Sequence, residues 1–121
     1  MKTSSCKAKG RELQKYVASL IQSMFGLPEE DVVSRPMGSP GQDIMLSAKA
    51  LQSLPLSIEC KNTKQFPSLA ALDQAFANTK GKAAIPVAVW KPPGKGYDKS
   101  IIYMDLRHFL WLMKAKDNTN V

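Results

Sequence analysis

Two carboxylates and one ammonium stand at positions where two neighbouring strands would bring them together. Asp43 leads a segment of alternating apolar and polar residues, and fifteen residues separate it from Glu59-Cys60-Lys61. A strand has a period of two, so Glu59 and Lys61 share one face while Cys60 points to the other, apolar face. Two carboxylates and an ammonium on one wet face are costly to hold together unless a cation or a phosphate joins them. This spacing therefore predicts a metal site.

A β-hairpin is the simplest element that would position these side chains. Residues 43–48 and 56–61 both alternate at the period of a strand, and residues 49–55 would form the turn between them. Asp43 then lies at the leading end of the first strand, while Glu59 and Lys61 lie on the second.

A helix before the hairpin supplies a third carboxylate. Apolar residues recur at helical spacing from Arg11 to Phe25, and Gly26-Leu27-Pro28 ends the pattern. Glu12 lies on the edge of this stripe, so it can lean over the polar face of the hairpin. The alternative is an acid of the first helical turn that only interacts favourably with the helix dipole. The stripe consists of Leu13, Tyr16, Val17, Leu20, Ile21 and Met24.

After the hairpin, the pattern predicts a helix, two strands and a last helix. Ser68 would cap a helix over residues 69–79, and residues 83–90 would form a strand buried on both faces, although Pro86 favours a start at residue 87. Residues 100–104 would pair with it in antiparallel fashion, before a helix over residues 106–114. The residues expected to be buried are Leu69, Leu72, Ala75, Phe76 and Thr79 on the first helix, and Phe109, Leu110, Leu112 and Met113 on the last.

Length and composition fit one soluble domain. The chain has 121 residues, of which 44% are hydrophobic, which is enough for one core and too few for two. No apolar run approaches the roughly 20 residues of a membrane span, and the N-terminus has no signal-peptide stretch. Cys6 and Cys60 form neither a disulfide framework nor a metal-ligand spacing. We expect a cytoplasmic domain over residues 11–115, with a flexible basic arm over residues 1–10 and a polar tail over residues 116–121.

Positive charge is concentrated in the second half of the chain. The net charge is +7; residues 1–60 contain seven Lys/Arg and six Asp/Glu, and residues 61–121 contain ten and four, so the halves carry +1 and +6. A basic surface attracts a polyanion, although such a balance is about as often plain solubility. The separation of acids from bases suits an enzyme that draws in phosphate with cations and presents it to a carboxylate-bound metal.

Several side chains are candidates for contacts with a nucleic-acid backbone. The loop over residues 91–99 is stiff and basic, and its Tyr97 could stack or fill a groove; a solvated loop with lysines for solubility is the alternative. The Gly- and Pro-rich loop over residues 35–41 could present Arg35 and Ser39 to a phosphate, and a plain connector is the alternative. The candidates are Lys9, Arg11, Arg35, Ser39, Lys64, Gln74, Lys91, Lys95, Tyr97 and Lys99.

Together these motifs resemble the PD-(D/E)xK nuclease superfamily, and within it the archaeal-type Holliday-junction resolvases and similar small phage endonucleases. The resemblance lies in Asp43, approached by Gly38-Ser39-Pro40-Gly41-Gln42, and in Ile58-Glu59-Cys60-Lys61. It also includes Lys9-Gly10-Arg11-Glu12-Leu13 at the first helix and Ala84-Ile85-Pro86-Val87 after a later helix. These features cover most of the chain in the order found in the superfamily.

The resemblance implies a restriction-endonuclease-like α/β fold, in which a mixed sheet flanked by helices carries the site. It implies that Asp43, Glu59 and Glu12 bind Mg²⁺ or Mn²⁺, and that Lys61 orients or activates the attacking water. Similar enzymes cut branched DNA as homodimers and leave a 5′-phosphate. The resemblance therefore implies a metal-dependent DNA endonuclease that resolves Holliday junctions or other branched DNA.

Three regions depart from the compact resolvases, namely the turn over residues 49–55, the basic loop over residues 91–99 and the terminal helix. Such regions govern which DNA shape is bound, so a replication- or restriction-linked nuclease of the same superfamily is an alternative. A nuclease-like module that binds DNA without cleaving it is another; the acid-acid-lysine set argues against it, because a binding module has no need to place carboxylates against a polyanion. Trp111 is a candidate for the dimer surface or for the core.

Overall fold

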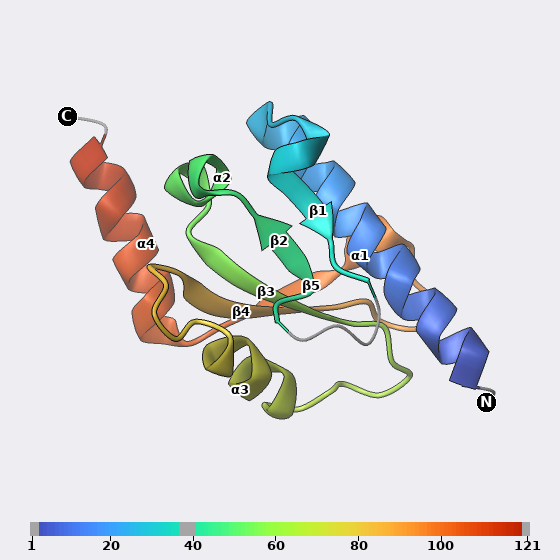
Figure 1. The fold of residues 1–121 in the computed structure, drawn as a ribbon. Helices are drawn as coiled ribbons and strands as arrows, with labels where there is room; N and C mark the ends of the chain where they lie inside the picture. Colours follow the sequence, from blue (N-terminus) through green and yellow to red (C-terminus); the bar gives the residue numbers. More distant parts are fainter. Residues whose placement is uncertain (1–2, 37–40, 120–121) are drawn as a thin grey trace.

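A mixed β-sheet flanked by helices forms the centre of this single-domain α/β protein (Figure 1). The computed structural model describes residues 3–36 and 41–119. The elements are α1 (Thr3–Phe25), η1 (Glu29–Asp31), β1 (Val32–Ser34), β2 (Ile44–Leu46), α2 (Ala48–Ser53), β3 (Leu56–Lys61), α3 (Ala70–Ala77), β4 (Ile85–Trp90), η2 (Tyr97–Lys99), β5 (Ile101–Tyr103) and α4 (Leu106–Thr119).

The strands form two ladders that meet between β2 and β3. In the first ladder β1 and β2 are antiparallel; in the second, β3 and β4 are parallel and β5 runs antiparallel to β4. The two ladders are joined where the backbone N–H of Asp43 donates to the carbonyl of Ile58 at 3.1 Å. Asp43 thus comes to lie beside the middle of β3.

Helices cover both faces of β3. On one face Ile58 and Cys60 pack in the core with Leu13 of α1. On the other face the Ser57 hydroxyl donates to the carbonyl of Ala75 in α3 at 3.2 Å. The second face of this strand was expected to be wet, and that expectation is wrong for Ser57 and Glu59, which are only 0% and 7% exposed. The site therefore lies in a half-enclosed environment.

Pro86 lies inside β4, which begins at Ile85 and not at residue 87. The N–H of Ile85 donates to the carbonyl of Pro55 on the β3 side, so the nitrogen of Pro86 points to the opposite side. There β5 pairs only with Ala88–Trp90. The missing N–H of proline therefore removes no bond of the ladder.

Three expected boundaries are corrected. Helix α1 begins at Thr3 and not at Arg11, so residues 3–10 are helical, and α4 continues to Thr119 through most of the expected tail. In place of a hairpin turn, α2 connects β2 to β3, because the side chain of Ser47 accepts a hydrogen bond from the N–H of Ala50 at 3.1 Å and caps a short helix. As a result, β2 pairs with β1 and forms no regular hairpin with β3.

The burial expected for the last two helices is also corrected. In α3 Ala75 is buried as expected, and Ala71 is buried too; both are small, which lets the helix approach the sheet closely, while Phe76 and the preceding Leu69 are exposed. In α4 only Leu112, of the residues expected to pack inward, packs against the core. The exposed ones are Phe109, Leu110 and Met113, together with Leu106 and Trp111.

Among the residues that the structure describes, no helix has both the length and the apolar character needed to cross a lipid bilayer.

Candidate active site

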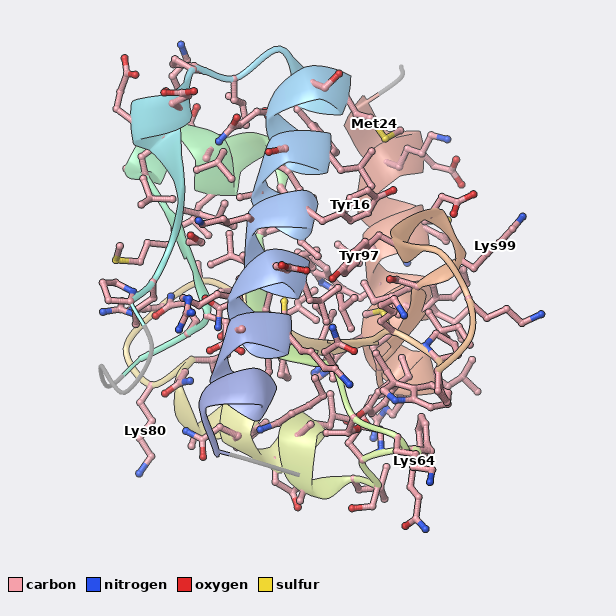
Figure 2. The ribbon with its side chains drawn as sticks, turned by 90° about the vertical axis from the view of Figure 1, so that its right-hand side faces the viewer. Tyr16, Met24, Lys64, Lys80, Tyr97 and Lys99 are labelled. Carbon is pink, nitrogen blue, oxygen red and sulfur yellow. The ribbon has the colours of Figure 1, made fainter. Side chains whose placement is uncertain are left out.

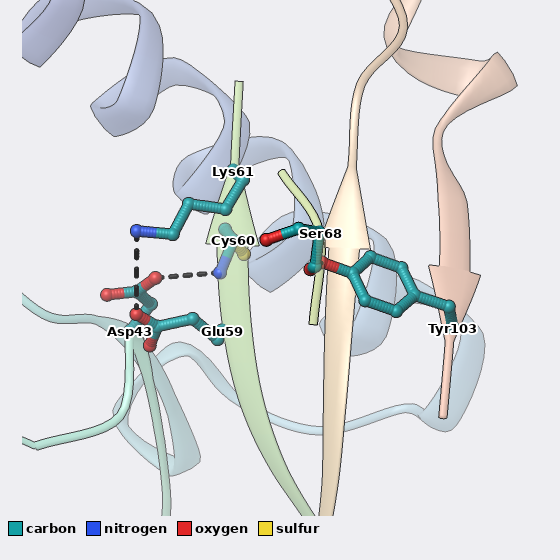
Figure 3. Close-up of polar contacts among 6 residues, drawn as sticks. All are labelled: Asp43, Glu59, Cys60, Lys61, Ser68 and Tyr103. Atoms are coloured by element: carbon teal, nitrogen blue, oxygen red, sulfur yellow. Dashed lines mark hydrogen bonds and ion pairs between the residues drawn. The ribbon is translucent and has the colours of Figure 1, made fainter. Parts of the chain in front are cut away.

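Strand β3 carries the two charged residues at the centre of the site. Glu59 is buried at 7% exposure, whereas the side chain of Lys61 is 40% exposed. The Lys61 Nζ atom lies 4.0 Å from Glu59 Oε2 (Figure 3). Because the two residues are two positions apart on a strand, they lie on the same face of the sheet. The predicted pairing of this carboxylate with this ammonium is confirmed.

Asp43 reaches the same place from the segment before β2. Its Oδ2 atom accepts a hydrogen bond from the backbone N–H of Cys60 at 2.7 Å (Figure 3). The acceptor is thus fixed to the residue between Glu59 and Lys61. The predicted meeting of Asp43, Glu59 and Lys61 is therefore confirmed, although one backbone and one side-chain hydrogen bond to β3, and not a regular hairpin ladder, make the connection.

Arg35 and Gly41 hold the chain that leads to Asp43. The Nε atom of Arg35 donates to the carbonyl of Gln42 at 2.7 Å, and its backbone N–H donates to the carbonyl of Asp43, also at 2.7 Å. Gly41 has a φ of +106°, and a Cβ at this position would come within 2.9 Å of the Arg35 guanidinium. Only glycine meets both conditions without strain. Arg35, predicted to contact DNA, acts here as a support for Asp43.

The two carboxyl groups are held where ionisation of both is unfavourable. Burial, and then the negative charge of Asp43, raise the pKa of Glu59 from 4.5 to about 7, although Lys61 opposes the change. Burial also raises the pKa of Asp43, against the opposing effects of the Cys60 N–H, Lys61 and Arg35. The closeness of the two carboxyl groups also lowers the pKa of Asp43 and raises that of Glu59. The pair therefore retains a proton near neutral pH unless a further cation arrives.

The donor set suits a hard divalent cation. The Glu59 Oε1 atom is buried and has no hydrogen-bond partner in the described part of the chain. An orphaned buried carboxylate oxygen is costly, and a cation would satisfy it. Mg²⁺ is commonly held by one or two carboxylates and keeps several waters, so Asp43 and Glu59 are sufficient ligands. No larger group of His, Cys, Asp or Glu suited to a metal occurs within residues 3–36 and 41–119.

Glu12 lies away from this pair. Its Oε2 atom accepts a hydrogen bond from the Tyr97 hydroxyl at 2.9 Å, and the Tyr97 ring stacks on Tyr16 with centroids 5.5 Å apart (Figure 2). Lys91 Nζ lies 5.4 Å from the centroid of the same ring. The expectation that Glu12 joins the acidic set is thus corrected, because it engages Tyr97 between α1 and the loop before β5. Contact of Tyr97 with DNA stays a prediction.

An open cleft lies beside the carboxylate pair and brings several other candidates together. Its volume is about 790 Å³, and Glu59, Lys61, Lys64 and Gln74 all contribute to its lining. Lys64 and Lys99 project from the molecular surface (Figure 2). The other exposed candidates are Lys9, Arg11 and Lys95. Ser39 lies outside the described residues.

Comparison of the chain with protein-family models, with curated proteins and with solved structures gives no match. The functional assignment therefore depends on the geometry of the site.

Two residues near the site were not among the candidates. Gln42 is 7% exposed; its Oε1 atom accepts from Lys82 Nζ at 3.3 Å, and its carbonyl accepts from Arg35. Phe66 lines the same cleft as Glu59 and Lys61 and is 51% exposed. The position of Gln42 next to Asp43 was a usable signal in the sequence. The sequence contains no such signal for Phe66, because the position of this residue depends on its contacts with β4 and β5.

Proposed function

We propose that this protein is a metal-dependent DNA endonuclease that hydrolyses phosphodiester bonds of branched DNA, such as four-way junctions, with a restriction-endonuclease-like fold of the PD-(D/E)xK type. The observation that carries the proposal is the meeting of Asp43, Glu59 and Lys61 beside an open, basic cleft. Holding both acids ionised at this place is unfavourable, because burial raises the pKa of each. Strongly perturbed titratable groups in a cleft are typical of catalytic sites.

Asp43 and Glu59 would hold Mg²⁺ or Mn²⁺. Bound there, such a cation would stabilise negative charge on a phosphodiester and lower the pKa of water. Glu59 must lose its proton before it can serve as a ligand, so its raised pKa makes cation binding weaker as the pH falls below about 7. The Cys60 N–H holds Asp43 Oδ2 at 2.7 Å and leaves the other carboxylate oxygen available.

Lys61 is placed to act on the phosphate or on the attacking water. Its side chain is 40% exposed and lines the cleft, so its ammonium can move from Glu59 towards a substrate. An ammonium beside the phosphate stabilises the charge that develops during hydrolysis. Lys64 and Gln74 line the same cleft and would contact the flanking backbone.

The exposed stripe of α4 supports the proposed homodimer. Leu106, Phe109, Leu110 and Met113 follow helical spacing, while Leu112 faces the core from another side of the helix. These four side chains are 43–69% exposed, so the stripe is an apolar patch on the surface of the single chain. A second copy of the chain paired through α4 would cover this patch.

A cleavage assay on four DNA structures tests the proposal. Labelled four-way junction, flap, linear duplex and single strand are incubated with the wild type in Mg²⁺ or in chelator. We expect metal-dependent cleavage of the branched substrates. Binding of all four structures without cleavage of any would instead favour a nuclease-like module that only binds DNA.

A further inference from the structure

The loop between β3 and α3, residues 62–69, is fixed at both ends by aromatic side chains of the sheet. The indole N–H of Trp90 donates to the carbonyl of Thr63 at 3.0 Å, and the Tyr103 hydroxyl donates to the carbonyl of Ser68 at 3.0 Å (Figure 3 shows Ser68 and Tyr103). Within the loop, the Thr63 hydroxyl donates to the carbonyl of Gln65 at 2.8 Å. A loop with these bonds has a defined shape although it is exposed to solvent.

Ser68 adds local strain to this arrangement. Its φ of +65° lies in the left-handed region, which residues other than glycine seldom adopt. Such strain persists only where the surroundings impose it, and it occurs often at functional sites. Here the bond from Tyr103 holds the strained carbonyl in place.

The fixed loop presents Phe66 to the cleft beside the carboxylate pair. The ring packs edge-on against Trp90, with centroids 5.3 Å apart, and lies tilted against Tyr103 at 4.8 Å. One side of Phe66 is therefore supported, while half of the residue remains exposed among the residues that line the cleft. An apolar ring held rigidly at the wall of a polar cleft is suited to contact a flat apolar ligand.

We propose that Phe66 stacks on an unpaired base of the DNA strand whose phosphate lies at Asp43 and Glu59. This inference rests on the proposed nuclease function and narrows its substrate to DNA with an unpaired or unstacked nucleotide at the site. A phosphate beside Glu59 and Lys61 places the attached nucleotide in the cleft, where Lys64 can neutralise the next phosphate. Every base has a π-face, so an aromatic platform accepts it without sequence preference.

The cleft has a size and composition that fit a nucleotide. Its volume of about 790 Å³ lies within the range of roughly 300–1,000 Å³ found for small-molecule sites. Its lining combines cationic side chains, the amide of Gln74 and the ring of Phe66. A base within an intact duplex is stacked on both sides and cannot offer a face to Phe66, so branch points and single-stranded segments are favoured.

The test uses Asp43→Asn as the parent protein, so that DNA is bound but not cut. The probe is a four-way junction that carries 2-aminopurine at a position beside the branch, scanned position by position, with the same strand in linear duplex as reference. We expect Phe66→Ala to weaken junction binding about 5- to 100-fold and to relieve quenching of the bound 2-aminopurine, with duplex binding unchanged. Phe66→Tyr should retain both properties. The matched control is Phe76→Ala, which removes an exposed phenylalanine of α3 and should change neither.

The outcomes separate the two claims. Equal junction affinity and equal quenching for Phe66→Ala and its parent would overturn the stacking role, and cleavage by the wild type would then leave the nuclease function standing. If the wild type cuts nothing but the Phe66-dependent quenching is observed, base stacking is supported and the nuclease function fails. Circular dichroism of each variant establishes that the change in binding does not come from unfolding.

Discussion

The Oδ2 atom of Asp43 lies 2.7 Å from the backbone nitrogen of Cys60 and accepts its hydrogen bond. This bond attaches the residue before β2 to the strand that carries Glu59 and Lys61. One oxygen of the carboxylate thus fixes the segment to the strand. Charge-assisted bonds of this kind are short and strong, so the spacing between Asp43 and Glu59 is set before any ligand binds.

We expect the stability of the protein to fall as pH rises through the titration of Glu59. The folded state binds this proton more tightly than the unfolded chain, because the pKa is about 7 in the fold and 4.5 in its absence. The free energy of unfolding should therefore decrease between pH 4.5 and pH 7, by roughly 2 to 3 kcal/mol. Glu59→Gln should remove this loss and be more stable than the wild type at pH 8 in chelator, but not at pH 4.5. Chemical denaturation of both proteins at pH 4.5 and pH 8 measures this difference in the free energy of unfolding.

Glu30→Gln is the matched control, because Glu30 is exposed and far from the pair in sequence. It should follow the wild type at both pH values. Equal stability of Glu59→Gln and wild type at pH 8 would contradict the burial of a poorly tolerated charge.

We expect Mg²⁺ to stabilise the protein in a manner that depends on pH. A cation that binds only the folded state raises the free energy of unfolding by an amount set by its concentration relative to Kd, about 1.4 kcal/mol at ten times Kd. The rise in Tm should be seen at pH 8 and vanish at pH 5, where Glu59 is protonated. Asp43→Asn should abolish the shift.

The same measurement tests the placement of Glu12. Since its carboxylate engages Tyr97, Glu12→Gln should keep the full Mg²⁺-dependent rise in Tm. Loss of the rise in this variant would show that Glu12 joins the acidic pair when metal binds.

Gly41→Ala should damage the site more than an equivalent change elsewhere. The substitution adds a Cβ within 2.9 Å of the Arg35 guanidinium and also strains a backbone with φ of +106°. We expect a loss of about 1 to 2 kcal/mol in stability and loss of the Mg²⁺-dependent rise in Tm. Gly26→Ala is the control, because its φ is +62° but no atom lies within 4 Å of the added Cβ. If both variants retained the response to Mg²⁺, Arg35 and Gly41 would not be supports of Asp43.

The strands that carry the site were predictable from the sequence because their side chains alternate. The bounds of β3 and the shared face of Glu59 and Lys61 follow from this alternation alone. The burial of Glu59 does not, because it depends on α3, whose small residues Ala71 and Ala75 allow close packing. The burial of a side chain such as Glu59 depends on packing between elements far apart in the sequence, and the local alternation of residues does not predict that packing.

The position of Glu12 and the role of α2 show the same limit. Helical spacing places Glu12 at the edge of an apolar stripe but does not tell which neighbour it meets, and Tyr97 comes from 85 positions away. Ser47 is a good N-cap residue, yet the flanking strand pattern suggested a simple turn. The burial of α4 was wrongly expected for another reason. Its apolar stripe at Leu106, Phe109, Leu110 and Met113 faces solvent in the single chain.

We expect the protein to form a dimer through α4. Light scattering after size exclusion should give about twice the mass of 13.3 kDa for the wild type at micromolar concentration. Leu110→Glu should give the monomer mass, because a charge at the centre of an apolar interface is left unpaired. Leu20→Glu, which changes an exposed leucine of α1, should remain dimeric. A monomeric wild type would exclude this surface as a dimer interface.

The most direct test of the central claim is cleavage of a labelled four-way junction by the wild type, Asp43→Asn and Glu59→Gln at pH 8 in Mg²⁺. We expect the wild type to nick the junction and both variants to be at least 100-fold slower while still binding it, because each removes a charged ligand of the cation. Cleavage by either variant at the wild-type rate would contradict the assignment of the Asp43–Glu59 pair as the catalytic centre.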